Sequence, residues 1–304
     1  MEGTRPFKRV VVIADLHCGH RVGLTPPDWQ SDAPGGKYLL IQQQLWEAYA
    51  GWIDALKPID FLFVNGDAVD GKGTRSGGTE LITSDRTKQI QMAFDCITYT
   101  GCKSIVMTYG TPYHVGEAED WEFVLSEILN AMAIKSHEWP CIDGIVFDLK
   151  HQAAGSSNIP YGRGGPLGKD KLANLMWAEY DAQPQADIFI RSHSHACFSV
   201  SEPHWIGVFT PALQGAGTKY GGRRCYGRVD FGVTVFDIYP GENLQDRVRW
   251  SWRTVFVQSQ KSGVLELSAS STTTMDPVTS GVHIAANGCQ QPTNSFWDDQ
   301  IVTV

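Results

Sequence analysis

The stretch VVVIADLHCGH, at residues 10–20, joins an apolar run directly to a cluster of polar residues and glycine. The stretch FLFVNGDAVDG, at residues 61–71, repeats this arrangement. Short runs of Val, Ile, Leu and Phe that end in glycine are typical of buried strands. In an open α/β sheet, the carboxyl ends of the strands form the crevice in which ligands bind. The two stretches therefore predict strands that carry a functional site at their carboxyl ends.

The chain up to residue 190 alternates short apolar runs with longer stretches of helical spacing. This alternation predicts an α/β fold with a largely parallel sheet. Further strands are predicted at residues 104–108, 145–149 and 187–190. Helices are predicted at residues 38–56, 85–99, 119–135 and 169–182.

The sequence changes character after residue 196, where strand-like runs follow one another with only turns between them. They predict antiparallel strands that form a second sheet or the far edge of the first. Residues 1–258 are predicted to form one catalytic domain, and the Ser- and Thr-rich residues 259–304 a tail or packing arm. The four strand-like runs cover residues 198–201, 205–210, 232–239 and 248–257.

The composition is that of a globular protein and excludes several classes. The 33 acidic and 25 basic residues give a formal net charge of -8, which argues against a broad basic surface that coats nucleic acid. The 7 cysteines cannot all pair within the chain and include no C-x-x-C, so we expect free thiols in a reducing, cytoplasmic compartment. The sequence has no apolar run of about 18 residues and no signal-peptide pattern, so we expect no membrane partner.

Aspartate or histidine comes after each of the five predicted strands up to residue 190. Carboxylate oxygen and imidazole nitrogen together bind divalent ions such as Mn, Fe, Zn and Ni. Residues two apart on a strand face the same side, so the pairs in D-x-H and H-x-H are each expected to point at one site. The residues are Asp15 and His17, Asp67 and Asp70, His114, His151, and His193 and His195.

Each of these residues has an ordinary explanation when it is taken alone. A single histidine at a strand end is usually a hydrogen-bonded polar residue, an H-x-H pair arises by chance, and aspartate after glycine is common in turns. The ordered recurrence at five strand ends is not explained in this way. The set therefore predicts a metal centre, and Asp67, which directly follows Gly66, is placed to bridge two ions.

The order D-x-H-x-G, G-D-x-x-D-G, a loop ending in histidine, a lone histidine and H-x-H resembles the calcineurin-like metallophosphoesterase superfamily. The resemblance spans about residues 10–240. It implies an α/β sandwich of two mixed β-sheets flanked by helices, with a dinuclear metal site at the strand ends. It further implies that Asp15, His17 and His195 hold one metal, that His151 and His193 hold the other, that Asp67 bridges them, and that Asp70 lies behind the ligands.

The third motif departs from the family pattern of Gly-Asn-His followed by an acid. Here the segment reads GTPYHVGE, at residues 110–117. Thr111 stands where the asparagine ligand is expected and is kept as a candidate ligand. His114 is the candidate general acid or phosphate contact, and a role as the replacement ligand stays open.

Two glycine-rich loops are predicted, YGRGGPLG at residues 161–168 and GAGTKYGGRRCYGR at residues 215–228. Both carry basic residues that are candidates for binding the phosphate charge. The alternative is that these loops are solvated surface. The candidates are Arg163 in the first loop and Lys219, Arg223 and Arg224 in the second.

These observations together predict a metal-dependent phosphoesterase in which a metal-bound hydroxide attacks phosphorus. A phosphodiesterase or nuclease acting on nucleic acid or a nucleotide is favoured, and a phosphomonoesterase or protein phosphatase is the alternative. Other possibilities are a non-catalytic scaffold of the same fold and, last, a mononuclear metal hydrolase. Two divalent ions are expected as cofactors, with manganese preferred over iron, zinc and nickel. The sequence indicates neither the natural substrate nor the oligomeric state.

Overall fold

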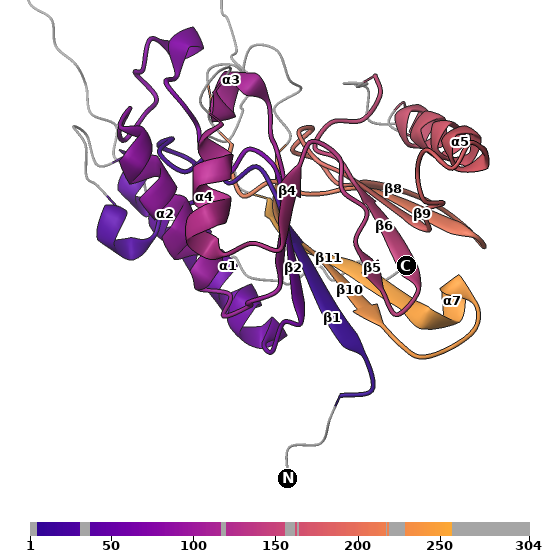
Figure 1. Ribbon diagram of the computed structural model, residues 1–304. Coiled ribbons are helices and arrows are strands. Elements are labelled where there is room, and N and C mark those ends of the chain that lie inside the picture. The colour runs from indigo at the N-terminus through magenta and orange to yellow at the C-terminus, as the bar shows by residue number, and fades with distance from the viewer. Residues whose placement is uncertain are drawn as a thin grey trace, which may run out of the picture.

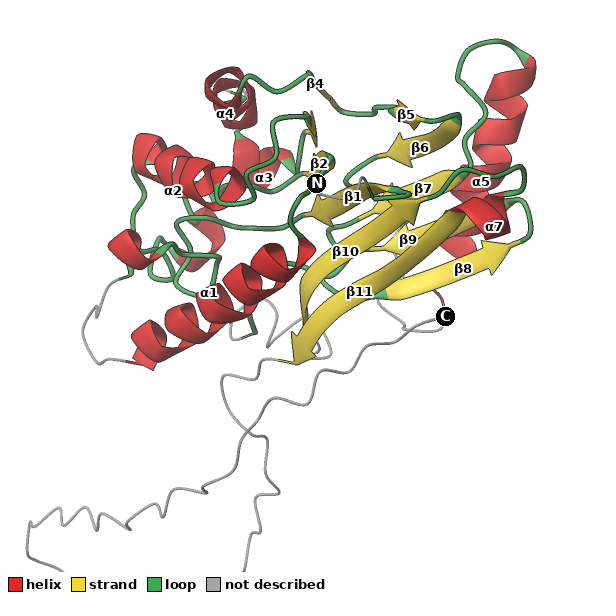
Figure 2. Cartoon of the chain, turned by 90° about the horizontal axis from the view of Figure 1, so that it is seen from below, coloured by secondary structure: helices red, strands yellow, loops and turns green. Residues whose placement is uncertain are grey.

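The computed structural model describes residues 5–30, 37–116, 120–155, 162, 164–216, 218 and 229–256. Two mixed β-sheets pack against each other, and helices cover their outer faces (Figure 1). Figure 2 shows α1 (Lys37–Leu56), α2 (Arg86–Thr98) and α4 (Trp121–Leu129) on one side of the sheets and α5 (Gly164–Glu179) on the other. The predicted α/β sandwich is therefore confirmed.

The first sheet has six strands in the order β11-β10-β1-β2-β3-β4. The strands β1 to β4 run parallel, whereas β10 and β11 are antiparallel additions at one edge. The parallel arrangement brings the carboxyl ends of β1, β2 and β3 to the same edge. The strands are β1 (Lys8–Ile13), β2 (Phe61–Asn65), β3 (Ile105–Thr108), β4 (Ala133–Lys135), β10 (Asp230–Ile238) and β11 (Val248–Phe256).

The second sheet has five strands in the order β5-β6-β7-β9-β8. Its central strands β6, β7 and β9 are parallel, and β5 and β8 are antiparallel edges. Both alternatives for the late strands thus occur, because β8 and β9 complete this sheet while β10 and β11 extend the first. The strands are β5 (Cys141–Ile142), β6 (Ile145–Leu149), β7 (Ile188–Arg191), β8 (Phe198–Glu202) and β9 (Trp205–Phe209).

The alternation of side chains along β1 explains how one strand serves two cores. Val10 and Val12 belong to the core between the sheets, whereas Val11 and Ile13 pack beneath the helices. Successive residues of a strand point to opposite faces, so a strand buried on both faces must be apolar throughout. This requirement accounts for the uninterrupted apolar run in the sequence.

Several element boundaries differ from the predicted ones. The helix predicted at residues 119–135 ends at Leu129, because Asn130 adopts a left-handed conformation, and residues 133–135 form β4 instead. The helix α5 begins at Gly164, five residues before the predicted start. Short helices at Pro112–Val115 (α3) and Leu244–Arg247 (α7), and 3-10 turns at Pro27–Trp29 and Thr74–Ser76, were not predicted.

The predicted domain boundary and the expected reducing, cytoplasmic compartment remain predictions. The proposed tail, residues 259–304, lies outside the described residues, so the domain boundary at residue 258 is untested. Within the described part of the chain, no helix combines the length and the apolar character needed to cross a membrane. The described cysteines, at positions 18, 96, 102, 141 and 197, are all free.

Candidate metal centre

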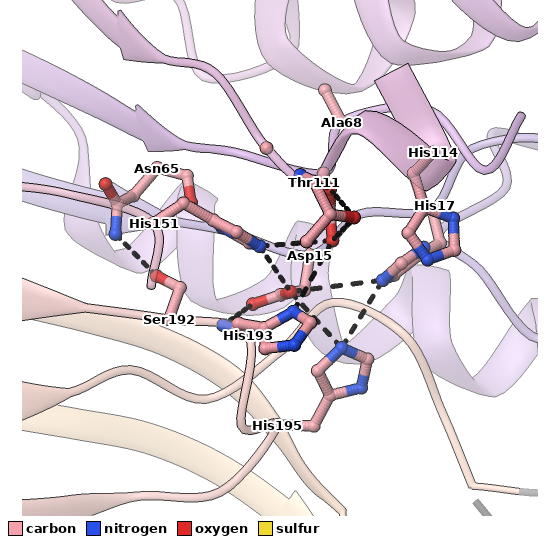
Figure 3. A network of polar contacts seen from close by, with 12 residues as sticks. Asp15, His17, Asn65, Ala68, Thr111, His114, His151, Ser192, His193 and His195 are labelled. Atoms are coloured by element: carbon pink, nitrogen blue, oxygen red, sulfur yellow. Dashed lines mark hydrogen bonds and ion pairs between the residues drawn. The ribbon is translucent and has the colours of Figure 1, made fainter. Parts of the chain in front are cut away.

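The loops after β1 and β2 run side by side beyond the end of the sheet. The backbone N–H of Asp15 donates to the carbonyl of Gly66 at 3.0 Å, and that of His17 donates to the carbonyl of Asp67 at 3.0 Å. From the second sheet, the backbone N–H of His193 donates to Asp15 Oδ2 at 3.1 Å. Polar residues from both sheets therefore converge on one place (Figure 3).

The backbone at this place is conformationally unusual. Nine described residues other than glycine have a positive φ, and five of them are predicted metal ligands. Such conformations cost energy for residues with a Cβ atom and cluster at functional sites. The five are Asp15, His17, Asp67, His193 and His195, with φ between 46° and 64°.

Potential metal-binding atoms form three groups in the described part of the chain. One joins His17, Asp70 and His114, so a role of His114 as a ligand stays open. The predicted ligands fall into the other two groups, of which one joins Asp15, Asp67, His151 and His193, and the other joins Asp15, His17 and His195. Within each group all donor atoms lie within 4.8 Å of one another. The residue common to both groups is Asp15, whereas the family resemblance implies Asp67 as the bridge. The bridging role of Asp67 therefore stays a prediction.

Two buried histidines are oriented by the hydrogen bonds of their outer nitrogens. His17 Nδ1 contacts Asp70 Oδ1 at 3.0 Å, and His151 Nδ1 contacts the carbonyl oxygen of Asn65 at 2.7 Å. Both partners can only accept, so each Nδ1 carries a proton. The Nε2 atoms are thereby directed at the carboxylates, which is how metal-binding histidines are commonly held. Asp70 thus has the position expected of a residue behind the ligands.

The electrostatics of the cluster favour positive charge. Burial opposes ionisation of Asp15 and Asp67, but neighbouring histidines outweigh it and lower the pKa of both carboxyl groups. Burial likewise disfavours the charged form of His151, yet Asp67 and Asp15 raise its pKa to about 10. Without a metal, protons on histidine therefore neutralise the carboxylates, and divalent cations would replace those protons.

One buried oxygen atom tests whether the residues fit a metal. Asp15 Oδ1 is buried and accepts no well-aligned hydrogen bond. Three histidine Nε2 atoms surround it, at 3.2 Å (His195), 3.8 Å (His151) and 3.9 Å (His17). A buried oxygen without a hydrogen bond is costly, and a cation shared with the imidazoles would satisfy it. The donor set therefore fits bound divalent ions.

The third loop meets the centre at Asp67. The backbone N–H of Thr111 donates to Asp67 Oδ1 at 2.6 Å, and the hydroxyl of Thr111 donates to the same oxygen at 3.1 Å. Gly110 is required here, because a Cβ atom at this position would overlap Asp67. Thr111 therefore positions the carboxylate of Asp67, and its role as a metal ligand stays a prediction.

His114 lies against the loops that come after β1 and β2. Its Nδ1 contacts the carbonyl oxygen of Asp70 at 2.8 Å, so this nitrogen carries the proton and Nε2 does not. Burial, together with the neighbouring His17, lowers its pKa to about 4. His114 is therefore neutral at pH 7 in the metal-free protein, and a general acid would need a further proton on Nε2.

One residue of the centre was not predicted from the sequence. Glu122, in the first turn of α4, is fully buried, and its two oxygens accept the backbone N–H groups of Ala68 and Gly110, each at 2.7 Å. It thereby joins the loop that carries Asp67 to the loop that carries Thr111. The available signal was its place on the buried face of the helix, at helical spacing with Leu125, Ser126 and Leu129.

A buried polar network joins the two sheets beneath the centre. The Asn65 side-chain amide donates to Ser192 Oγ at 2.6 Å, and the Thr108 hydroxyl donates to Asn65 Oδ1 at 2.8 Å. The Ser192 hydroxyl also pairs with that of Thr210 at 2.8 Å. Because these residues end β2, β3, β7 and β9 or come directly after them, the network fixes the strand ends of one sheet relative to the other.

The predicted phosphate contacts cannot be placed. Arg163, Lys219, Arg223 and Arg224 all lie outside the described residues. A cavity of about 270 Å³ does open beside His193. Its other described lining residues are all uncharged, namely Gln152, Ala153, Gly155, Ser192, Ser194 and Phe209.

No family model and no curated protein matches the chain. Among solved structures, wild-type Vps29 complexed with Zn²⁺ from Entamoeba histolytica is 15% identical, with a TM-score of 0.40 over 81% of this chain and 92% of that chain. An archaeal phosphodiesterase is 12% identical, with a TM-score of 0.42 over 82% and 99%. A predicted phosphoesterase from Streptococcus pneumoniae TIGR4 is 10% identical, with a TM-score of 0.36 over 83% and 91%.

The likeness to these solved structures is distant and concerns the fold. At such low identities and TM-scores the solved structures do not indicate an activity. What the protein does must be inferred from its own site.

Proposed function

We propose that the protein is a dinuclear-metal-dependent phosphoesterase, and within that class a phosphodiesterase. The main support is the buried Asp15 Oδ1, which three histidine Nε2 atoms surround, together with the membership of Asp15 in two groups of potential metal ligands. The strained backbone at the proposed ligands is a second, independent support, since a fold without a function there would have no reason to keep it.

The proposed ligands divide between the two donor groups. Asp15, His17 and His195 would hold one cation, and His151 and His193 the other, with Asp67 between them. Two divalent cations bound there would polarise the phosphate and make a water molecule a stronger nucleophile. The residues themselves supply a rigid carboxylate and imidazole frame, which Asp70 and the carbonyl of Asn65 hold in place.

His114 is the residue proposed to assist the leaving oxygen. Its pKa of about 4 leaves it neutral in the free protein. An anionic phosphate ester bound beside it would stabilise the imidazolium and raise that pKa. His114 would then hold a proton on Nε2 that it donates to the departing alkoxide, while Nδ1 stays on the carbonyl of Asp70.

Two features favour a diester over a monoester. The cavity beside His193 offers a phosphate substituent a space whose other described lining residues are uncharged, which suits an esterified organic group better than a second negative charge. The glycine-rich loops supply arginine, lysine and tyrosine in sequence, a composition that suits a nucleotide or single-stranded nucleic acid. The proposed substrate is therefore a nucleotide-type phosphodiester, which makes a nuclease activity an expected form of the reaction.

Manganese is the proposed native metal. The proposed ligand atoms are oxygen and nitrogen, and no thiolate is among them, because Cys18 Sγ is buried against Cys96 and the carbonyl of Leu24. The two carboxylates suit manganese, the four imidazoles also suit iron, zinc and nickel, and the thiolates that would favour zinc and softer metals are absent from the proposed set. Iron, zinc and nickel remain alternatives for the metal analysis to decide.

The proposal is tested with metal-free protein reconstituted with Mn²⁺ and offered three substrates: bis-p-nitrophenyl phosphate, p-nitrophenyl phosphate and single-stranded DNA. Hydrolysis of the diester, faster than that of the monoester, is expected. Hydrolysis of the monoester alone would overturn the diesterase assignment and leave the phosphoesterase class standing. Fewer than about one bound metal per chain together with no hydrolysis would indicate a non-catalytic scaffold instead.

A further inference from the structure

The helix α5 presents an apolar face to solvent. Its inner face packs on the second sheet through Leu167, and Asn174 bonds the segment before β7, where it donates to the carbonyl of Pro184 and accepts from the N–H of Ala186. On the outer face, Leu172 and Met176 lie four residues apart, and Tyr180, directly after the end of the helix, continues their line as one stripe. The exposed fractions are 60% for Leu172, 38% for Leu175, 57% for Met176, 52% for Trp177 and 76% for Tyr180. Monomeric proteins rarely leave so many large apolar side chains together in water, and such patches mark interaction surfaces.

Opposite charges lie near the two ends of this stripe. Lys169 lies three residues before Leu172, and Glu179 lies directly before Tyr180. Both charged residues are exposed. Ten residues of helix separate them, which is about 15 Å along the axis. The outer face of α5 therefore carries a positive end, an apolar centre and a negative end.

Such a face is complementary to a second copy of itself. If two α5 helices lie antiparallel about a twofold axis near residue 174, Lys169 lies opposite Glu179 of the partner subunit, and the symmetry makes this pair twice. The same register places Leu172 opposite Met176 of the partner subunit. Residue 174 lies midway between Leu172 and Met176, as it does between Lys169 and Glu179. We propose that α5 is the contact surface of a homodimer with this antiparallel arrangement.

The distribution of charge argues against other occupants of this surface. A membrane surface rich in anionic lipid would repel a protein of net charge -8 whose exposed helix face includes Glu179. The other exposed apolar helix face, on α4, includes Phe123, Val124 and Ile128, but its exposed charged residue is Glu127, with no cation on that helix to pair with it. The face of α4 is therefore not self-complementary and provides a matched control.

Sedimentation equilibrium of the full chain over about 1 to 200 μM tests the proposal. This concentration range is suitable because an interface formed by one helix from each subunit belongs to the weak end of specific interfaces. A monomer–dimer equilibrium is expected. The variant Met176→Glu, which places a carboxylate in the centre of the stripe, should be monomeric throughout, and Ile128→Glu on α4 should dimerise like the wild type. A wild-type protein that is monomeric at every concentration would overturn the proposal, as would equal effects of the two variants.

A charge exchange tests the antiparallel register. Lys169→Glu and Glu179→Lys should each weaken dimerisation about tenfold, because each variant creates two repulsive pairs, and the double variant should restore it to within about threefold. Failure of the double variant to restore dimerisation contradicts this register.

Discussion

The two sheets contribute unequal halves to the candidate metal centre. The proposed metal ligands that come after β1 and β2 are almost inaccessible, with exposed fractions of 0% for Asp15, 2% for His17 and 1% for Asp67. Of the residues that come after strands of the second sheet, His193 and His195 keep 41% and 20% of their side chains exposed. If the centre binds metal ions as proposed, the first half would be formed before a metal arrives, and the second half would be the side from which solvent and substrate reach it.

The physical cause lies in the hydrogen bonds behind each half. Asp70 holds His17, and Glu122 joins the two loops that carry Asp67 and Thr111. The H-x-H segment contacts the first half through the backbone N–H of His193, which donates to Asp15, and through His195 Nε2, which lies 3.2 Å from Asp15 Oδ1. His151 is the exception in the second half, since the carbonyl of Asn65 in the first sheet holds it. We therefore expect metal affinity to depend mainly on the first half.

The largest effect is expected for Asp67→Asn, which keeps the shape of the side chain and removes its charge. Two cations held at adjacent positions would then face each other with one negative charge fewer between them. We expect phosphodiesterase activity to fall by at least about a thousandfold, as for other residues that act as a catalytic unit. Turnover of bis-p-nitrophenyl phosphate and metal content by mass spectrometry measure this.

The matched control is Asp28→Asn, at an exposed position in a 3-10 turn, which should change neither quantity. Asp67→Asn with wild-type turnover would overturn the dinuclear account.

The comparison of the two halves is tested directly by removing one histidine from each. His17→Ala should weaken Mn²⁺ binding by at least about a hundredfold, because even residues behind metal ligands commonly cost 10–100-fold. His193→Ala should cost about tenfold, since its exposed side chain is less firmly held. Calorimetric titration of both variants gives the two dissociation constants, and a greater loss for His193→Ala would reverse the assignment of the halves.

A smaller effect is expected from removing the residue that orients His17. Asp70→Ala deletes the acceptor for His17 Nδ1, and we expect metal affinity to fall about tenfold. Asp70→Asn keeps an oxygen that can accept this bond and should recover most of the loss. Identical losses in the two variants would mean that the charge of Asp70, and not its orienting bond, is what matters.

The smallest effect concerns stability. Burial raises the pKa of Glu122 from 4.5 to about 7, so the folded protein holds this proton more tightly than the unfolded chain. The contribution of Glu122 to the free energy of unfolding is therefore full below about pH 4.5 and decreases by on the order of 3 kcal/mol as the pH rises to about 7. Glu122→Gln cannot titrate and should lack this decrease. Urea unfolding of metal-free wild type and variant at about pH 5 and about pH 8 measures the difference. Parallel pH dependences would contradict the assignment.

Much of this centre could be predicted because its residues are tied to strands. Asp15 and His17 come directly after an unmistakable apolar run, and parallel strands bring the residues at their carboxyl ends to one edge of the sheet. The same rule accounts for the positions of Asp67, His151 and the H-x-H pair. For this reason, residues that are far apart in the sequence but come after neighbouring strands lie close together in the structure.

Other features depend on contacts that no local pattern encodes. Glu122 matters because α4 packs where its carboxylate can reach two backbone N–H groups of distant loops. The tautomer of His114 is set by a carbonyl 44 residues away in the chain. Tertiary packing decided both points. The end of α4 is different, because asparagine often adopts the left-handed conformation that ends a helix, and Asn130 was therefore an available local signal.

The central claim is that the centre holds two divalent cations between unequal halves. Calorimetric titration of metal-free full-length protein with Mn²⁺ tests it most directly. We expect two ions per chain, a tighter one that is sensitive to His17→Ala and a weaker one that is sensitive to His193→Ala. A stoichiometry of one ion or none, or two ions that both ignore these substitutions, would contradict it.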